Sequence, residues 1–491
     1  MGRLKVLFTS AEVVPYAKVG GLADVSGALP KALEKMDLDV RLAMPLYGTI
    51  SPKEFGLRKV TEAEPIPVPL GDEKALLWHS RLPDSDVGVY FFENKRFFSR
   101  SGVYSNPRTG KSYADNALRF AFFDGAILEW IRTDDWKPDL IHANDFHCGL
   151  IPAYLRTKYS RDPLLSGIKT IFSIHNLAYQ GRFPMEILSQ IGLPQELAQP
   201  MGAVEFFGEI NYMKAGLVFA DLISTVSEGY AQEIQESAEF GQGLEGVLRS
   251  RSADLYGILN GVDYTQWDPE NDQLISHQYG LGDLFGKGKN KTALRKILGL
   301  PRPNQEQPLV GMISRLADQK GFDLVLQAAE EILALDLQLV ILGTGQKEYH
   351  RQLEVLQKKH PRKLGLALTF DNRLAHQIEA GADMFLMPSR YEPCGLNQMY
   401  SLRYGTIPIV RATGGLADTI LDANQHPQDG NGFVFREYRA DEMMTAITRA
   451  VEAFANRDLW QKLVERAMAA DFSWARSAEK YRQLYQRALQ K

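Results

Sequence analysis

The sequence predicts an α/β fold made of two doubly wound domains followed by a helical tail. Short apolar runs alternate with helical stretches, the pattern pauses at residues 257–290 and then restarts, and the chain is 491 residues long. Such alternation is typical of parallel sheets covered on both faces, and this length exceeds one ordinary core. We expect domains over 1–255 and 256–470, and a helix over 471–491 that returns to the first domain.

The predicted elements follow in order along the chain. β-rich runs lie at 4–10, 39–45, 87–92, 139–144, 169–176 and 222–227, then at 308–314, 337–343, 364–370, 384–389, 407–410 and 432–435. Helical stretches lie between them, at 115–131, 211–220 and 321–336, and after about residue 440 the sequence is wholly helical. Because ligands of such sheets bind beyond the carboxyl ends of the strands, the residues just after each strand are the candidates for function.

Composition excludes several classes of protein. A net charge of −4 gives no polybasic signature, so we expect neither nucleic acid nor a membrane surface as partner. No run reaches the eighteen apolar residues that a membrane span needs, and the N-terminus has no signal-peptide pattern. Two cysteines, Cys148 and Cys394, do not make a disulfide scaffold. We therefore expect a cytoplasmic protein, and the oligomeric state stays open.

A glycine pair follows the first strand, in "KVGGLADV" (18–25), and the same Gly-Gly-Leu-Ala-Asp recurs at 414–418. Glycines between a strand and a helix let backbone N–H groups approach a ligand at the positive end of the helix. Lys18 adds a full charge, so Gly20 and Gly21 could approach a diphosphate. The alternative is a tight turn with a solvated lysine.

Cationic residues follow the strand at 308–314, in "SRLADQKGFD" (314–323). Arg315 offers a planar fork to phosphate oxygens, and Lys320 offers a compact charge. Two cations at the end of a buried strand suit the stabilisation of a departing diphosphate. An exposed loop with two solvated cations is the alternative.

Three further segments carry polar residues after strands. In "PSRYEPCGL" (388–396) Glu392 could hold sugar hydroxyls and Gly395 and Leu396 offer N–H groups, whereas Cys394 suits a packed thiol. "HANDFHCGL" (142–150) and "SIHNLAYQG" (173–181) carry His142, Asp145, His147, His175 and Asn176. The histidines and Asp145 could be taken for a metal cluster, but their spacing matches no standard zinc pattern, which favours a polar sugar-binding rim.

Together, and in this order, these segments resemble the bacterial glycogen synthases and plant starch synthases. The resemblance covers nearly the whole chain and rests on "KVGGLADV", "HANDFH", "SIHNLAYQG", "SRLADQKG", "PSRYEPCGL" and "TGGLADT". It implies the GT-B fold, in which two Rossmann-like domains face a cleft. Two positions depart from the family: Phe146 stands where many relatives have Trp, and Asn144 where some bacterial ones have His.

The resemblance also implies residue roles. Lys18, with Gly20 and Gly21, would contact the diphosphate of a nucleotide sugar, and Arg315 and Lys320 would neutralise it as it leaves. His175 and Glu392 would contact the donor glucose and complete the expected catalytic residues. The remaining expected substrate contacts are Asp24, Asp145, Asn176, Cys394, Gly395, Leu396, Thr413, Gly414 and Gly415, with Phe370 stacking on the base.

The activity implied is transfer of glucose from ADP-glucose to the non-reducing end of an α-1,4-glucan (glycogen or starch) with retention, without a cofactor or metal. The location implied is the bacterial cytosol, or the plastid stroma if a transit peptide has been removed. The alternatives are a GT-B glycosyltransferase with another acceptor, such as a sucrose- or trehalose-phosphate-forming enzyme, and a catalytically silent glucan-binding partner. A nicotinamide dehydrogenase is disfavoured, because no G-x-G-x-x-G follows a predicted first strand.

Overall fold

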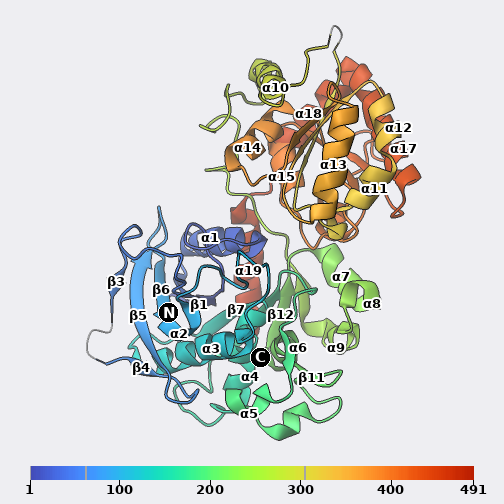
Figure 1. Cartoon of the computed structure of the whole chain (residues 1–491). Coiled ribbons are helices and arrows are strands. Elements are labelled where there is room, and N and C mark those ends of the chain that lie inside the picture. Colours follow the sequence, from blue (N-terminus) through green and yellow to red (C-terminus); the bar gives the residue numbers. More distant parts are fainter. Residues whose placement is uncertain (1, 61–63, 304–305) are drawn as a thin grey trace. The chain divides into compact units, whose positions relative to one another are not determined.

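The computed structural model of the chain describes residues 2–60, 64–303 and 306–491, which form two compact units (Figure 1). Unit 1 comprises Met1–Val226, Ala231–Gly261 and Trp474–Lys491, and unit 2 comprises Ser227–Tyr230 and Val262–Ser473. These breaks lie a few residues beyond the positions expected from the sequence. Among the described residues, none of the helices combines the length and the apolarity that crossing a bilayer requires.

Unit 1 is built on a mixed sheet with the strand order β13-β12-β8-β7-β1-β2-β6-β5-β3. The strands from β13 to β6 run parallel, and β5 and β3 add antiparallel at one edge, with β4 paired to β5. The bounds are β1 Lys5–Thr9, β2 Asp39–Pro45, β3 Arg58–Lys59, β4 Ile66–Pro67, β5 Lys74–Arg81, β6 Gly88–Glu93, β7 Leu140–Asn144, β8 Lys169–Ile174, β12 Leu222–Thr225 and β13 Leu255–Gly257. A small antiparallel sheet joins β9 (Arg182–Pro184), β10 (Glu205–Phe206) and β11 (Glu209–Asn211).

Helices cover this sheet (Figure 1). They are α1 Gly21–Glu34, α2 Lys95–Phe98, α3 Asn116–Thr133, α4 Leu150–Arg156, α5 Ile187–Ile191, α6 Tyr212–Phe219, α7 Glu228–Glu236, α8 Ala238–Gly241, α9 Glu245–Ser250 and α19 Trp474–Ala488, with 3₁₀ turns η1 Phe146–Cys148, η2 Gln195–Ala198 and η3 Ser252–Asp254. The C-terminal helix α19 packs against α1, and Tyr485 Oη lies 2.8 Å from Nδ1 of the buried His142.

Unit 2 is a parallel sheet with the order β16-β15-β14-β17-β18-β19. Its strands are β14 Leu309–Ile313, β15 Gln338–Leu342, β16 Leu364–Ala367, β17 Met384–Met387, β18 Ile407–Arg411 and β19 Phe433–Phe435. Its helices are α10 Phe285–Ile297, α11 Phe322–Gln327, α12 Ala329–Ala334, α13 Lys347–Lys359, α14 Asn372–Gly381, α15 Asn397–Arg403, α16 Gly414–Thr419, α17 Ala440–Ala455 and α18 Arg457–Ala469, with the 3₁₀ turn η4 Asp318–Lys320. The strands are almost wholly buried, which explains their continuous apolar sequence.

Each strand expected from the sequence is present within three residues, and the structure differs from expectation in the following local details. Residues 321–336 form two short helices, α11 and α12, which meet at Ala328 (φ −94°, ψ 7°) while keeping one buried apolar face. Residues 257–290, where the sequence pattern pauses, already contain the start of α10. Strand β5 and the small β9–β11 sheet were not expected.

Candidate active site

In each unit several predicted residues follow strands at or beside the point where the chain order of the sheet reverses. In unit 2, β14 and β17 are adjacent, and the segments after them carry Arg315, Lys320 and Glu392. In unit 1, β7 lies between β1 and β8 in the sheet. The segments after these three strands carry Lys18, Asp145 and His175. Such reversal points are where ligands of open α/β sheets bind.

Lys320 and Glu392 form an ion pair in unit 2. Lys320 Nζ lies 2.5 Å from Glu392 Oε2, which also accepts a hydrogen bond from Ser389 Oγ at 3.0 Å. Both side chains are largely buried, with 19% of the Lys320 side chain and 7% of the Glu392 side chain exposed. Lys320 closes turn η4, and Gly321 after it has φ +75°, a conformation that favours glycine. The pair ties the turn after β14 to the turn after β17.

The second glycine pair packs against the backbone of the Glu392 turn. A Cβ on Gly414 would lie 2.1 Å from the carbonyl oxygen of Glu392, and a Cβ on Gly415 would lie 2.1 Å from that of Cys394. Gly414 also has φ +43°, and Gly415 N donates to Glu392 O at 3.1 Å. Both glycines are buried, so they allow two backbone segments to meet closely.

The first glycine pair lies in the opposite environment. Gly20 and Gly21 are exposed, and a Cβ on Gly20 would meet no atom within 4 Å. Lys18 Nζ lies 2.6 Å from Asp24 Oδ1, and 47% of the Lys18 side chain is exposed. The same pentapeptide, Gly-Gly-Leu-Ala-Asp, thus begins in an exposed loop in unit 1 and in a close contact between two backbone segments in unit 2.

The carboxylate of Glu12 binds the backbone of the open loop. Its Oε2 accepts hydrogen bonds from Val19 N at 2.5 Å and Gly20 N at 2.7 Å, and its Oε1 accepts one from Tyr104 Oη at 2.6 Å. Glu12 is 4% exposed, and this burial raises the pKa of its carboxyl. The N–H groups of Val19 and Gly20 are therefore engaged within the protein.

Asp145, His175 and Asn144 meet at the ends of β7 and β8. Asp145 Oδ1 accepts a hydrogen bond from His175 N at 2.7 Å, and Asp145 has φ +55°. Burial raises the pKa of Asp145 to about 7 and lowers the pKa of His175 to about 3, so the imidazole is neutral at physiological pH.

The hydrogen bonds of Asn144 assign the tautomer of His175. Asn144 Nδ2 donates to the carbonyl oxygens of Thr9 (3.0 Å) and His142 (3.2 Å), which fixes the orientation of the amide. Asn144 Oδ1 therefore faces His175 Nε2 at 2.8 Å, and that nitrogen must carry the proton. The lone pair is left on Nδ1. Asn144, where some relatives have His, is thus an orienting partner for His175.

His142 and His147 do not belong to a polar rim. His142 is fully buried and Nε2 lies 2.6 Å from Ser173 Oγ, while His147 is 5% exposed and stacks on Tyr104 with ring centroids 4.5 Å apart. Burial lowers the pKa of each to about 3. Phe146 packs against His147 and Phe183. Among the described residues there is no group of three or more His, Cys, Asp or Glu able to hold a metal ion.

The other predicted residues of unit 2 lie as follows. Arg315 is exposed directly after β14, and Phe370 is 78% exposed after β16. Cys394 is buried and reduced, as expected for a packed thiol, and Gly395 has φ +69° before α15. Thr413 is 1% exposed before α16. Leu396, at the start of α15, is partly buried. In unit 1, Asn176 is also partly buried, and its Oδ1 accepts a hydrogen bond from Ala178 N at 3.1 Å.

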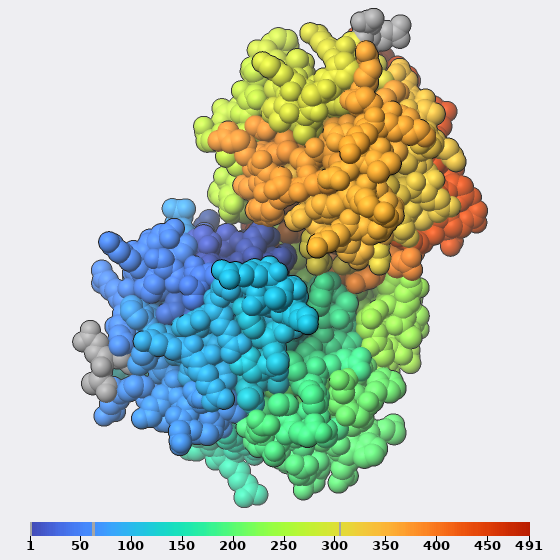
Figure 2. All heavy atoms as spheres, in the orientation of Figure 1, coloured from blue at the N-terminus to red at the C-terminus, as the bar shows by residue number. Residues whose placement is uncertain are grey.

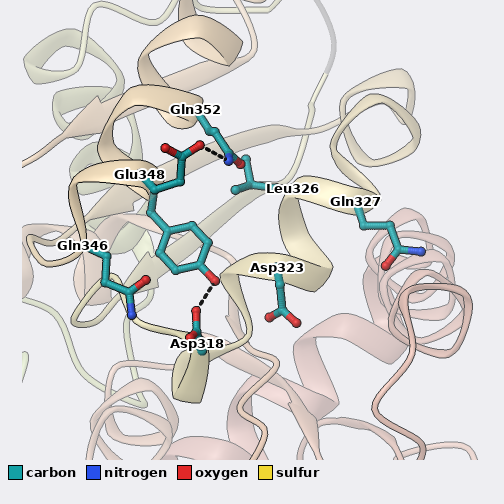
Figure 3. A pocket seen from close by; sticks show the side chains of 8 residues that line it. Asp318, Asp323, Leu326, Gln327, Gln346, Glu348 and Gln352 are labelled. Atoms are coloured by element: carbon teal, nitrogen blue, oxygen red, sulfur yellow. Dashed lines mark hydrogen bonds between the residues drawn. The ribbon is translucent and has the colours of Figure 1, made fainter.

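A polar cavity of about 540 Å³ lies behind the Lys320 turn (Figure 3). Its lining residues are Asp318, Asp323, Leu326, Gln327, Gln346, Glu348, Tyr349 and Gln352. Tyr349 Oη donates to Asp318 Oδ1 at 2.5 Å, which links α13 to turn η4. None of these residues was expected in the site, and Asp318 is the lining residue that also belongs to turn η4.

Sequence reasoning missed Glu12, Tyr104 and the role of Ser389. Glu12 had one available signal, because it is a carboxylate inside an otherwise apolar stretch directly after the first strand, "FTSAEVV". Tyr104 had none, since its contact with Glu12 joins residues 92 positions apart.

The comparisons with known proteins now bear on this geometry. Residues 5–250 match the family model described as "Starch synthase catalytic domain", and residues 296–467 match "Glycosyl transferases group 1". The chain is 47% identical to the glycogen synthase of Anaeromyxobacter dehalogenans over 98% of both chains, and 45% identical to that of Thermosipho africanus over 99% of this chain and 100% of the other.

Solved structures agree with these relatives. The catalytic domain of starch synthase IV from Arabidopsis thaliana, solved with ADP and acarbose, superposes with a TM-score of 0.90 at 34% identity over all of both chains. Sucrose-phosphate synthase from Thermosynechococcus elongatus, at 18% identity and a TM-score of 0.58 over 99% of both chains, shares the fold alone. The chain therefore belongs to the glycogen and starch synthase family and is a glycosyltransferase of the GT-B fold.

Proposed function

We propose that the protein transfers glucose from ADP-glucose to the non-reducing end of an α-1,4-glucan with retention at the anomeric carbon. Glucosyl transfer in glycogen or starch synthesis is the activity of its family, and the nucleotide, the acceptor end and the stereochemistry are the proposal. The observation that carries it is the Lys320–Glu392 ion pair at the reversal point of the unit 2 sheet.

Arg315 and Lys320 stabilise the leaving diphosphate. Both are cations in segments that follow β14, and the largely buried position of Lys320 strengthens its interaction with a developing negative charge. Lys18 adds a third cation, oriented by Asp24, beside the exposed backbone of Gly20 and Gly21. Since Glu12 already engages Val19 N and Gly20 N, the backbone donors left for the diphosphate are those at the start of α1.

Glu392 engages the donor glucose, together with the backbone of Gly395 and Leu396. Its Oε2 holds Lys320 and Ser389, and in this proposal Oε1 accepts a hydrogen bond from a sugar hydroxyl. Thr413, Gly414, Gly415 and Cys394 act through this turn: the two glycines pack on its backbone, so their role is to position Glu392 rather than to contact the ligand.

His175 serves as a neutral acceptor of a hydrogen bond. Its Nε2–H is committed to Asn144, so Nδ1 offers a lone pair to a sugar hydroxyl. A pKa of about 3 makes it unsuited to general-acid catalysis at neutral pH. Asp145 fixes the backbone of His175, and Asn176 is the next residue of the same loop.

The bond changes in the proposed step balance without a protein nucleophile. The acceptor hydroxyl oxygen bonds to the anomeric carbon, the bond from that carbon to the β-phosphate oxygen breaks, and the hydroxyl proton passes to the leaving diphosphate on the same face. A double-displacement mechanism would instead need a carboxylate nucleophile and a paired acid. Stabilisation of the diphosphate by Arg315, Lys320 and Lys18 supports the first route. The ADP bound to starch synthase IV supports the choice of nucleotide, with Phe370 as the exposed ring for the base.

Incorporation of labelled glucose into glycogen tests the proposal, with ADP-glucose and UDP-glucose compared in parallel and with an anomeric-configuration analysis of the product. We expect incorporation from ADP-glucose and α-linked product. Incorporation from UDP-glucose alone would refute the nucleotide assignment, and a protein that binds glycogen but releases no ADP would refute the transferase assignment.

A further inference from the structure

Gln398 lies in the first turn of α15, directly after the Glu392 turn (residues 392–396) that carries Gly395 and Leu396. Gln398 is 0% exposed. Helix α15 is labelled in Figure 1 and belongs to the orange part of unit 2 in Figure 2. Neither the predicted site nor the proposed function includes this buried amide, although it lies beside the residues that both of them use.

The amide nitrogen of Gln398 binds the backbone of the preceding turn. Gln398 Nε2 donates to the carbonyl oxygens of Cys394 at 2.9 Å and Gly395 at 3.1 Å, and to Thr419 Oγ1 at 3.3 Å. Carbonyl oxygens can only accept hydrogen bonds, so the atom that faces them must be the nitrogen, which assigns the orientation of the amide. Thr419 Oγ1 in turn donates to Gly415 O at 2.6 Å, so the amide also joins the turn to α16.

This arrangement is not a helix cap. A glutamine near the start of a helix stabilises it through its side-chain oxygen, which accepts a hydrogen bond from a free backbone N–H. Gln398 Oε1 instead lies against Gly395, where a Cβ would be 2.4 Å away, and is among the described buried side-chain atoms without a hydrogen-bond partner. A buried amide oxygen in this state costs free energy, because it has lost its hydrogen bonds to water. The amide must therefore have a role other than stabilising the start of α15.

The two bonds to carbonyl oxygens fix the direction of two backbone N–H groups. In a trans peptide the N–H points opposite to the carbonyl of the same planar unit. The bond to Cys394 O therefore directs Gly395 N–H away from Gln398, and the bond to Gly395 O directs Leu396 N–H away from it. Within the part of the chain that the structure describes, neither N–H donates to another group of the protein. These are the two backbone N–H groups proposed above for the donor glucose.

We propose that Gln398 is a positioning residue for glucose transfer. Its amide holds two carbonyl oxygens on the side of α15, so that Gly395 N–H and Leu396 N–H point away from the helix and toward the donor glucose. Gln398 is itself buried and acts only through this backbone. N–H groups that are oriented in advance need no rearrangement at the moment of reaction, which makes them effective. The inference rests on the proposed function, in which these N–H groups contact the sugar of ADP-glucose.

The variant Gln398→Met tests the proposal, because methionine has nearly the same length and cannot donate a hydrogen bond. We expect kcat/KM for ADP-glucose to fall about 10²-fold, the cost of misplacing binding groups. The melting temperature should change little, because removal of the unpaired oxygen offsets the lost hydrogen bonds. Titration calorimetry without acceptor compares ADP-glucose with ADP. The affinity for ADP-glucose should weaken and that for ADP should stay unchanged, since ADP lacks the glucose that the two N–H groups contact.

Gln338 provides a matched control in the same unit. It is 2% exposed at the start of β15, and its Nε2 also donates to two carbonyl oxygens, those of Pro301 at 3.0 Å and Arg362 at 3.1 Å. Its Oε1, however, accepts a hydrogen bond from Arg295 Nε at 2.7 Å. Gln338→Met should therefore lower the melting temperature more than Gln398→Met does, and it should leave kcat/KM and both affinities unchanged.

Gln398→Asn is the second variant, should Gln398→Met fail to fold. It keeps the amide but is one methylene shorter, so it cannot reach both carbonyl oxygens and should show the same loss of kcat/KM. Wild-type kcat/KM in either folded variant would overturn the positioning role. Equal weakening of ADP and ADP-glucose binding would also overturn it, because the N–H groups would then not act on the sugar. Failure of the proposed function is a separate result, in which the wild-type enzyme transfers no glucose from ADP-glucose to glycogen.

Discussion

Lys320 Nζ and Glu392 Oε2 lie 2.5 Å apart, although the two residues are separated by 72 positions in the sequence. The turn after β14 and the turn after β17 meet because their strands are neighbours in the sheet. The proposed function assigns Lys320 to the diphosphate and Glu392 to the sugar. Their pairing means that each holds the other in place.

Lys320→Ala should lower kcat by about 10²–10³-fold, the usual cost of removing one strong electrostatic donor. It also leaves the buried Glu392 carboxylate without its cation, which should lower the free energy of unfolding by about 3–5 kcal/mol. The double variant Lys320→Ala, Glu392→Gln has no unpaired carboxylate at this position, so it should recover most of the lost stability. It should recover none of the lost activity. Steady-state kinetics and thermal unfolding check both effects.

A matched control is available in unit 2. Lys359 and Glu330 form an ion pair of 2.6 Å in which both side chains are more than half exposed. Lys359→Ala should change neither kcat nor stability measurably, since exposed ion pairs contribute little. A Lys320→Ala enzyme with near-wild-type kcat would contradict the role of Lys320 in stabilising the leaving diphosphate.

The two glycine pairs predict opposite responses to the same substitution. Gly414→Ala should destabilise unit 2 strongly: its φ of +43° costs about 1–3 kcal/mol for alanine, and the new Cβ collides with Glu392 O. Gly20→Ala should leave the melting temperature unchanged, because φ is −140° and the space is open. If the loop backbone approaches the diphosphate, Gly20→Ala should raise the KM for ADP-glucose. Equal melting temperatures for the two variants would show that their environments do not differ as described.

This contrast shows how far sequence reasoning reaches. The strand positions and the segments after them could be predicted, because buried parallel strands are continuous apolar runs and ligands bind beyond their carboxyl ends. The difference between Gly20 and Gly414 could not, since the local sequence is identical and only the contact of Gly414 with a turn more than twenty residues away distinguishes them.

The histidines make the same point. His142, His147 and His175 were all expected in a polar rim from the residues alone, and only the family resemblance gave His175 a substrate contact. The structure assigns His142 to a contact with Tyr485 in the C-terminal helix and His147 to stacking on Tyr104, neither of which is encoded near the histidine itself. Only His175 remains as a candidate for substrate contact, and its orientation depends on Asn144.

Glu12 should be essential for the geometry of the open loop. Glu12→Ala removes the acceptor of Val19 N and Gly20 N, so the loop should lose its fixed shape and kcat/KM for ADP-glucose should fall about 10²-fold, as expected for misplacement of a binding group. Glu12→Gln keeps one oxygen acceptor and should have a smaller effect. Tyr104→Phe removes only the hydrogen bond from Tyr104 Oη to Glu12 Oε1, so its effect on kcat/KM should be smaller than that of Glu12→Ala. Wild-type kcat/KM in Glu12→Ala would show that the loop shape does not depend on this carboxylate.

Asn144→Leu should impair catalysis without unfolding the protein's sheet. The amide fixes the Nε2–H tautomer of His175, and leucine leaves that N–H without an acceptor. We expect kcat/KM to fall in Asn144→Leu. The variant Asn144→His, which introduces the residue that some relatives have, should retain more activity than Asn144→Leu. An NMR spectrum of ¹⁵N-histidine-labelled protein would check the tautomer, and a protonated Nδ1 in the wild type would contradict the assignment.

Asp145 should make stability depend on pH between about 4 and 7. Its carboxyl has a pKa of about 3.8 in the unfolded chain but of about 7 when buried in the fold, so the unfolded state releases its proton first as the pH rises. The stability due to this group is therefore complete below about pH 4 and is lost as the pH rises through 7, by about 1.4 kcal/mol per pH unit. Asp145→Asn keeps the acceptor for His175 N–H and should remove this loss, so its melting temperature relative to wild type should rise from pH 4 to pH 8. Asp139→Asn is the control, because Asp139 is exposed and also accepts a backbone N–H, from Lys5. A constant difference in melting temperature between Asp145→Asn and wild type across this range would contradict the raised pKa.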